Sequence, residues 1–177
     1  YEGLSVEQVG LPIQLFQKLG ATKVILTNSA GCLQSKWTLG DVMIVNGHYD
    51  FTYRDSSKNP ELVNGPNYYC EHLIQKALKI KPDLRIGNYG WVLGPMYETK
   101  AEIDNMKKHG VHSVGMSTVP EILMAHKLEL DILVLSLMSN YAIGLTNDDL
   151  NHQIVLDNSV KYNKNFKLLL LSILSEI

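Results

Sequence analysis

The chain has 177 residues, 45% of them hydrophobic and 19% charged, and a formal net charge of −2. This size and balance predict one globular domain with a sizeable core, and the lack of a basic stripe argues against nucleic acid as a partner. No run of eighteen apolar residues occurs, so no membrane-spanning segment is expected. The two cysteines, Cys32 and Cys70, form no CxxC pair, so we expect reduced thiols, a cytoplasmic location and no zinc site.

Predicted helices and strands alternate along the chain. The residues from Ser5 to Gln8 have the pattern of a capping box, and helical spacing of apolar residues follows as far as a stop at Gly20, with Pro12 as an irregularity. Further capping boxes are predicted at residues 99–102 and 118–121, and further helices at residues 68–80 and from residue 149 to the end. Strands are predicted at residues 23–27, 41–46, 85–93, 113–116 and 131–138. This alternation predicts an α/β fold, a single domain over residues 1–177 with a central mixed twisted sheet flanked by helices.

Polar and aromatic side chains gather where predicted strands end, in residues 28–31, 97–98, 116–117 and 139–140. Ligands of open α/β sheets bind beyond the carboxyl ends of the strands, so these four segments are expected to converge on one site. The site would hold the Tyr97 ring, the Glu98 carboxylate, the Met116 thioether, the Ser117 hydroxyl and the Asn140 amide. Such a set suits a heterocycle that carries a sugar and a phosphate.

Three of these residues also fit a plain structural role when each is taken alone. Met116 would fill the core, Glu98 would favour the positive end of a helix dipole, and Asn140 would start a turn. These alternatives weaken jointly, because the residues occur in the order that one binding site requires.

Several motifs follow one another through most of the chain. They are TNSAGCL at 27–33, LGDVM at 39–43, GPMYET at 94–99, GMSTVPE at 115–121, SLMSNYA at 136–142 and Asn151-His152. In this order they resemble the trimeric purine nucleoside phosphorylases of the inosine and guanosine type. The resemblance runs from Tyr1 to about Leu156, and GPMYET with GMSTVPE at this spacing is highly specific.

The resemblance implies roles for the matched residues. The substrate-binding positions that it implies are Tyr1, Tyr97, Glu98, Met116, Asn140, His152 and Val155. Among these, Tyr97 would stack on the purine, Tyr1 would reach a ribose hydroxyl and His152 would meet the 5′-hydroxyl. Met116 would pack under the ribose. The phosphate-binding positions that it implies are Ser29, Ala30 and Ser117.

The implied reaction is phosphorolysis of inosine or guanosine, with inorganic phosphate as co-substrate and no metal or redox cofactor. Breaking an N-glycosidic bond builds positive charge on the sugar and negative charge on the departing purine. Asn140 would stabilise charge on N7 of the base, and Glu98 would accept a hydrogen bond from N1–H of a 6-oxopurine. These two are therefore the expected catalytic residues, while the phosphate needs positioning more than activation. The resemblance also implies a homotrimer.

The sequence departs from the family pattern at several points. Upstream of Tyr1 the family carries a phosphate loop with an Arg and a His. We therefore expect the N-terminal portion of the fold to be missing from this sequence. The chain as given is expected to bind the purine base but to show weak phosphorolysis, because the basic residues that hold phosphate are missing from it. The connection from Asn67 to Tyr68 is shorter than in the family, where an aromatic residue of that loop covers a neighbouring subunit's ribose site. Cys32 stands where Gly is usual, and Gln34 where Asn is usual.

Two alternatives stay open. One is a nucleoside-binding paralogue without catalytic activity, which would keep the base pocket and lose the phosphate site. The other is a methylthioadenosine phosphorylase, which is disfavoured because that branch has a small residue at the position of Glu98 and Asp at the position of Asn140.

Overall fold

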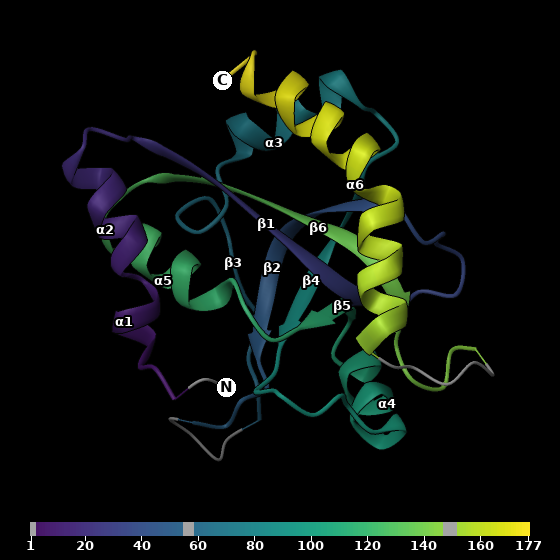
Figure 1. Ribbon diagram of the computed structural model, residues 1–177. Coiled ribbons are helices and arrows are strands. Elements are labelled where there is room, and N and C mark those ends of the chain that lie inside the picture. The colour runs from purple at the N-terminus through teal and green to yellow at the C-terminus, as the bar shows by residue number, and fades with distance from the viewer. Residues whose placement is uncertain (1–2, 55–58, 147–151) are drawn as a thin grey trace.

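Six strands form one mixed sheet in the computed structural model, which describes residues 3–54, 59–146 and 152–177 (Figure 1). The strands are β1 Lys23–Cys32, β2 Val42–Asp50, β3 Val63–Asn64, β4 Arg85–Trp91, β5 Val111–Gly115 and β6 Asp131–Tyr141. Their order in the sheet is β3-β2-β4-β5-β1-β6, and β6 also pairs with the start of β2. This confirms the predicted α/β class, with the difference that β2 also pairs with β6, so the sheet closes on itself instead of being open.

Parallel and antiparallel pairs are both present in this sheet. β1 runs parallel to β6, and β4 runs parallel to both β2 and β5. β1 meets β5 in an antiparallel pair only at its last two residues, and β2 meets β6 in the same sense. Because β1 and β6 run together along their whole length, the segments at their carboxyl ends lie side by side.

Helices surround the closed sheet, with bounds α1 Val6–Val9, α2 Leu11–Lys18, α3 Glu71–Ile80, α4 Lys100–Lys108, α5 Val119–Lys127 and α6 His152–Leu174. α5 packs against β6 and β1, and α1 and α2 pack on α5. α3 and α6 cover β6 on another side, while α4 packs against β5 (Figure 1).

Two strands run at least four residues beyond their predicted ends. β1 continues through the small residues 28–32, and β2 continues from residue 47 to Asp50. β1 pairs with β6 as far as Cys32, so this pairing outweighs the preference of small residues for loops. In β2, His48 and Tyr49 are buried and pair with β4.

Helix starts agree with the capping boxes at Ser5 and Thr99, where both halves of the box are present. The single helix expected from Ser5 to Gly20 is divided at Gly10. A Cβ at Gly10 would lie 2.7 Å from Cβ of Met124, so the division allows the backbone to approach α5 closely. The third predicted capping box is wrong, because Thr118 has φ 79° and its side chain does not cap α5.

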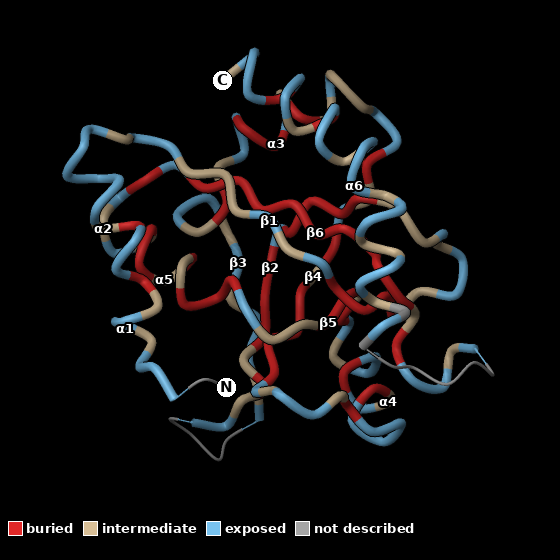
Figure 2. Tube along the Cα trace, viewed as in Figure 1, coloured by how far each residue is buried: buried red, intermediate tan, exposed pale blue. Residues whose placement is uncertain are grey.

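The core centres on β6, which is buried from Ile132 to Asn140 (Figure 2). This confirms the prediction of a strand covered on both faces, made from its nearly continuous apolar sequence. Leu133 and Leu135 are 1% and 0% exposed, and each such side chain contributes about 1.5–3 kcal/mol by leaving water. A rigid β6 supplies fixed geometry to the residues at its carboxyl end.

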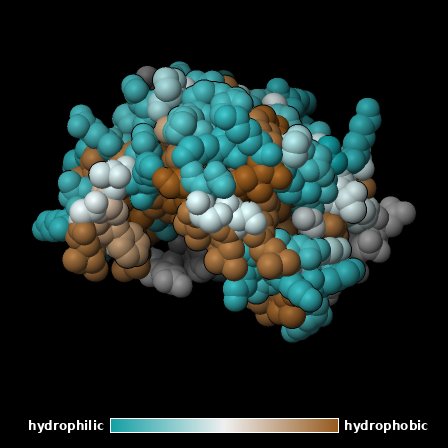
Figure 3. Space-filling view, turned by 90° about the horizontal axis from the view of Figure 1, so that it is seen from above, coloured by the Kyte–Doolittle hydropathy of each residue, from teal (hydrophilic) through white to brown (hydrophobic). Residues whose placement is uncertain are grey.

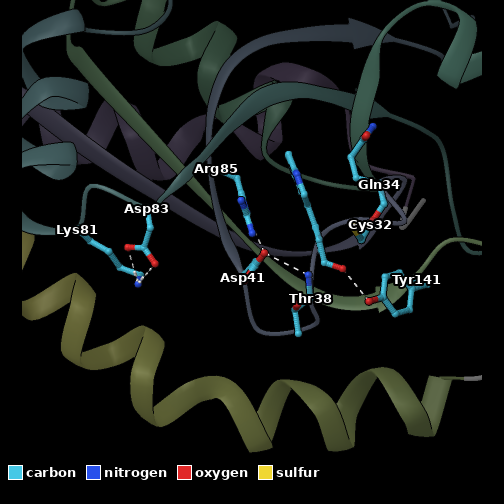
Figure 4. Close-up of polar contacts among 9 residues, drawn as sticks. Cys32, Gln34, Thr38, Asp41, Lys81, Asp83, Arg85 and Tyr141 are labelled. Atoms are coloured by element: carbon cyan, nitrogen blue, oxygen red, sulfur yellow. Dashed lines mark hydrogen bonds and ion pairs between the residues drawn. The ribbon is translucent and has the colours of Figure 1, made fainter.

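The loop between β1 and β2 is anchored to the sheet (Figure 4). Asp41 accepts hydrogen bonds from the backbone N–H of Thr38 at 3.2 Å and from Nε of Arg85 at 2.9 Å. Cys32 is fully buried, its Sγ donates to the carbonyl of Gln34 at 3.4 Å, and burial raises the pKa of its thiol. Of the two departures from the family motif, Cys32 ends β1 and Gln34 begins the turn that follows, where the backbone N–H of Trp37 donates to the carbonyl of Gln34 at 3.2 Å.

An apolar surface remains exposed on α2, whose outward side chains are Leu11, Leu15, Phe16 and Leu19. Figure 3 shows hydrophobic atoms among hydrophilic ones on the upper face, including the left side, where Figure 1 places α2. Within the described ranges, no helix is long and apolar enough to cross a membrane.

Candidate active site

A cavity of about 180 Å³ lies beside the carboxyl ends of β1, β5 and β6. Its lining residues are Ser29, Gly31, Tyr97, Glu98, Val114, Gly115, Met116, Ser117, Ser139, Asn140 and Val155. All four segments that the sequence singled out contribute to this one cavity. Ala30 does not line it, being 2% exposed. Tyr1 lies outside the described residues, and His152 begins α6 with a side chain that also lies outside them.

Asn140 is placed by an irregularity between β1 and β6. Ala30 pairs with Met138 and Gly31 with Asn140, so Ser139 is an extra residue on β6. Bulges of this kind re-aim side chains and are frequent next to active sites. Here Oγ of Ser139 lies 3.0 Å from Oδ1 of Asn140 and 3.4 Å from the carbonyl oxygen of Ala30, so its one hydrogen is directed mainly at the nearer amide oxygen.

The amide nitrogen of Asn140 faces the cavity wall formed by β1. Its Nδ2 donates one hydrogen to the carbonyl of Tyr141 at 3.1 Å, which leaves a second hydrogen for a ligand. A Cβ at Gly31 would lie 3.3 Å from this Nδ2, so only glycine leaves the amide undisturbed. Asn140 is 7% exposed and is therefore a pre-positioned donor.

Glu98 brings a carboxylate into the same cavity at 7% exposure. Burial raises the pKa of Glu98 above its ordinary value, partly offset by a hydrogen bond from its own backbone, while the nearby charge of Glu102 raises it further. A buried carboxylate of this kind favours a ligand that brings a hydrogen-bond donor. Its neighbour Tyr97 is partly buried and adds a ring to the cavity wall.

A second cavity, of about 200 Å³, shares Met116 and Ser117 with the first. Arg54 and Glu121 also line it, beside the apolar wall of Trp91 and other side chains. Oε2 of Glu121 is buried and has no hydrogen-bond partner in the described part of the chain, and burial raises the pKa of this carboxyl. Two adjoining cavities suit a ligand in two parts.

Sequence reasoning missed Arg54 and Glu121 as cavity residues. Arg54 falls in a stretch expected to be loop, where no pattern distinguishes one basic residue from another. Glu121 was assigned to a capping box, and hydrogen bonds from the backbone of Glu121 itself and of Thr118 do lower its pKa somewhat. Only the folded chain shows that Arg54 and Glu121 line the same cavity.

Hydroxyl groups form a short network behind Ser117. Nδ2 of Asn28 donates to Oγ1 of Thr118 at 2.9 Å, and Oγ1 of Thr118 lies 3.1 Å from Oγ of Ser117. The Tyr89 hydroxyl donates to the carbonyl of Ser117 at 3.2 Å. Asn28 sits inside the singled-out segment 28–31, yet its sequence context assigned it no role.

His48 does not line either cavity. His48 is 2% exposed, its Nδ1 lies 2.6 Å from the Tyr69 hydroxyl, and burial lowers its pKa to about 4, so it is neutral at physiological pH. Among the residues that the structure describes, no group of three His, Cys, Asp or Glu could hold a metal ion.

Comparison with known proteins matches both the sequence and the fold. The phosphorylase superfamily model matches residues 3–175. Purine nucleoside phosphorylase 1 of Bacillus subtilis is 34% identical over an alignment of 193 residues, which covers 99% of this chain and 69% of that protein. Other curated relatives are matched over 50 to 65% of their length.

Solved structures of Schistosoma mansoni purine nucleoside phosphorylase resemble the whole chain. The complex with inosine has a TM-score of 0.88 and 25% identity, covering 100% of this chain and 69% of that one. The complex with adenosine has a TM-score of 0.86 and 25% identity, with coverage of 100% and 70%. By sequence and by fold, the chain belongs to the purine nucleoside phosphorylase family.

Proposed function

We propose that the protein catalyses phosphorolysis of inosine and guanosine to the free purine base and ribose 1-phosphate. The observation that carries this proposal is the cavity in which the carboxylate of Glu98 and the amide of Asn140, both 7% exposed, meet Met116 and Ser117. The first two groups suit a purine, and the second two suit the sugar and the anion that attacks it. The reaction recovers free bases, which places the protein in purine salvage, and the two free cysteines agree with a cytoplasmic location.

Glu98 is the residue that selects the base. A 6-oxopurine carries N1–H, which donates to the carboxylate, whereas N1 of a 6-aminopurine is an acceptor and leaves the carboxylate without a partner. A site built for one hydrogen-bond pattern rejects the other by about 10⁴–10⁵. Because similar structures hold inosine and adenosine alike, turnover rather than crystal binding is the measure of this selectivity.

Asn140 stabilises the departing base. Negative charge grows on the purine as the N-glycosidic bond breaks, and an amide hydrogen directed at N7 meets that charge without moving. Since Ser139 holds the other side of the amide at 3.0 Å, little reorganisation is needed in the transition state.

The sugar and phosphate lie toward the second cavity. Met116 and Ser117 line both cavities, so a ribose over Met116 places its anomeric carbon near an anion held by the Ser117 hydroxyl and the backbone at Ser29, which lines the first cavity. Ala30 remains a prediction for phosphate binding. Tyr1, His152 and Val155 remain predictions for the ribose and substrate contacts; of these, Val155 lines the base cavity. No metal or redox cofactor is needed for this chemistry, with phosphate as the co-substrate.

The direct test is the product formed from inosine with and without phosphate. We expect hypoxanthine and ribose 1-phosphate, with a rate that rises with phosphate concentration, and little reaction with adenosine. The dependence on phosphate is diagnostic, whatever the absolute rate. Equal turnover of adenosine and inosine, or formation of free ribose only, would contradict the proposal, and base binding without any turnover would favour the non-catalytic paralogue.

A homotrimer completes the proposed site. Met116 is partly buried and Ser117 is exposed in the single chain, so water would reach a ribose placed over them. An oxocarbenium-like centre must be protected from water, and a cyclic trimer lets each subunit cover its neighbour. The exposed apolar face of α2 also supports association. Light scattering at micromolar concentration should give three times the chain mass, and a stable monomer would remove this part of the proposal.

A further inference from the structure

The chain turns sharply where β5 leads into α5, and Thr118 is at the centre of the turn. Its φ of 79° and ψ of −39° lie in a region that residues with a branched Cβ seldom adopt. The backbone N–H of Val119 donates to the carbonyl of Ser117 at 3.0 Å, which makes a γ-turn of the rare, strained form. Strain of this kind persists where the surroundings impose it, and it is concentrated at functional sites.

A consequence of this turn is that two hydroxyl groups of neighbouring residues come together. The Thr118 side chain is 5% exposed and lies between Asn28 and Ser117. Ser117 itself is exposed and lines both cavities. The buried hydroxyl therefore connects β1 to a hydroxyl that a ligand can reach.

The hydrogen-bond directions in this network follow from the groups involved. Nδ2 of Asn28 can only donate, so Oγ1 of Thr118 accepts there. The Thr118 hydroxyl then has one hydrogen, and its other recorded hydrogen-bond partner is Oγ of Ser117. A buried hydroxyl hydrogen needs an acceptor, so Thr118 donates to Ser117. Ser117, having accepted, keeps its own hydrogen for another acceptor, which a ligand in the cavities that it lines can supply.

The orientation of the Asn28 amide is supported by its other atom. Oδ1 of Asn28 is buried without a partner in the described residues. If the amide were turned over, the group without a partner would be an NH₂ with two hydrogens, which proteins avoid more strictly than an unpaired carbonyl oxygen. The recorded orientation is the one that makes Asn28 the start of the chain of donors.

We propose that Asn28 and Thr118 are positioning residues that make Ser117 a hydrogen-bond donor to the phosphate co-substrate. This inference rests on the proposed function, because it takes the anion beside Ser117 to be phosphate. An anion accepts hydrogen bonds and cannot donate to a hydroxyl unless it carries a proton, so it can accept the hydrogen that Ser117 keeps for another acceptor.

The test uses variants of the two hydroxyl residues in the full chain. Thr118→Val keeps the branched shape and removes the donor, while Thr118→Ser keeps the donor. Ser117→Ala and the double variant Ser117→Ala with Thr118→Val complete a double-mutant cycle. Thr22→Val is the matched control, because Thr22 is exposed and lies just before the start of β1, away from Asn28. Inorganic phosphate binding is measured by ³¹P NMR titration, alongside KM for phosphate and for inosine and thermal unfolding.

We expect Thr118→Val to weaken phosphate binding and to raise KM for phosphate about tenfold, with KM for inosine nearly unchanged. Thr118→Ser and the control should stay close to the unmutated protein. In the Ser117→Ala background, Thr118→Val should add no further loss, since a residue that acts only through Ser117 has nothing left to position.

Three results would overturn the inference. The first is phosphate binding by Thr118→Val that equals that of the unmutated protein. The second is a tenfold weakening of phosphate binding by Thr118→Val that is just as large in the Ser117→Ala background. The third is a lack of phosphate binding by the unmutated protein. The proposed function fails separately, if the unmutated protein binds phosphate but does not cleave inosine.

Discussion

Glu98→Gln should lower kcat/KM for inosine roughly 10- to 100-fold, because a hydrogen bond to a charged acceptor becomes a neutral one. The same change should narrow the gap between inosine and adenosine. An amide can present either its oxygen to N1–H of a 6-oxopurine or its nitrogen to N1 of a 6-aminopurine, so selectivity falls together with rate. Initial rates with the two nucleosides at saturating phosphate measure both effects.

Glu98→Gln should also make the protein more stable at neutral pH. Burial raises the pKa of Glu98 in the folded protein, so the folded state binds this proton more tightly than the unfolded chain does. Stability from this group is therefore present at low pH and is lost as pH rises from the unfolded pKa through the raised folded one. Glutamine does not ionise, so the variant does not lose this stability at neutral pH. The difference in melting temperature between variant and parent should shrink as the pH falls below the ordinary pKa range of Glu.

Glu102→Gln is the matched control for the inosine kinetics. Glu102 lies on the exposed start of α4, and glutamine can keep the capping box with Thr99. Inosine kinetics should be unchanged in this variant. A Glu98→Gln protein with unaltered inosine turnover and selectivity would show that this carboxylate does not contact the base.

Asn140→Asp should reduce inosine turnover about 10²–10³-fold and raise adenosine turnover. A carboxylate next to N7 opposes the negative charge that grows on a departing 6-oxopurine, whereas it accepts from the 6-amino group or from a protonated N7 of adenine. Ser139 still donates to the carboxylate at the position of Oδ1, so the side chain keeps its place.

The same substitution has a structural cost that can be measured. Nδ2 of Asn140 donates to the carbonyl of Tyr141, and an oxygen in its place must hold a proton or move away. We therefore expect a lower melting temperature, while Asn105→Asp on the exposed face of α4 should change neither stability nor substrate preference. An Asn140→Asp enzyme that still prefers inosine by the parental ratio would contradict the N7 assignment.

Most secondary elements, and the four segments that line the first cavity, could be found from the sequence for identifiable reasons. Short strands with apolar patterns and capping boxes depend on neighbours in the chain, so β6 and the start of α4 could be found locally. The segments around Glu98, Met116 and Asn140 were recognisable because each pairs a strand end with a chemically distinctive side chain. Their convergence on one cavity follows from the parallel pairing of β1 with β6 and of β4 with β5.

Other features depend on contacts between distant parts of the chain. The extension of β1 to Cys32 depends on pairing with β6, and the closure of the sheet depends on β2 meeting that same strand. The positive φ of Thr118 and its bond to Asn28 reverse the local preference for a capping box. Arg54 and Glu121 share a cavity through the path of the backbone, which no local pattern encodes.

Equilibrium binding of free bases tests the central claim most directly, because it depends on Glu98 and Asn140 and not on phosphate. Calorimetric titration of the protein with hypoxanthine and with adenine, in parallel with the Glu98→Gln variant, provides the measurement. We predict that hypoxanthine binds at least about 100-fold more tightly than adenine, and that the variant loses most of this difference. Equal affinity for the two bases in the unmutated protein, or a preference that survives Glu98→Gln unchanged, would contradict the assignment of this cavity to a 6-oxopurine.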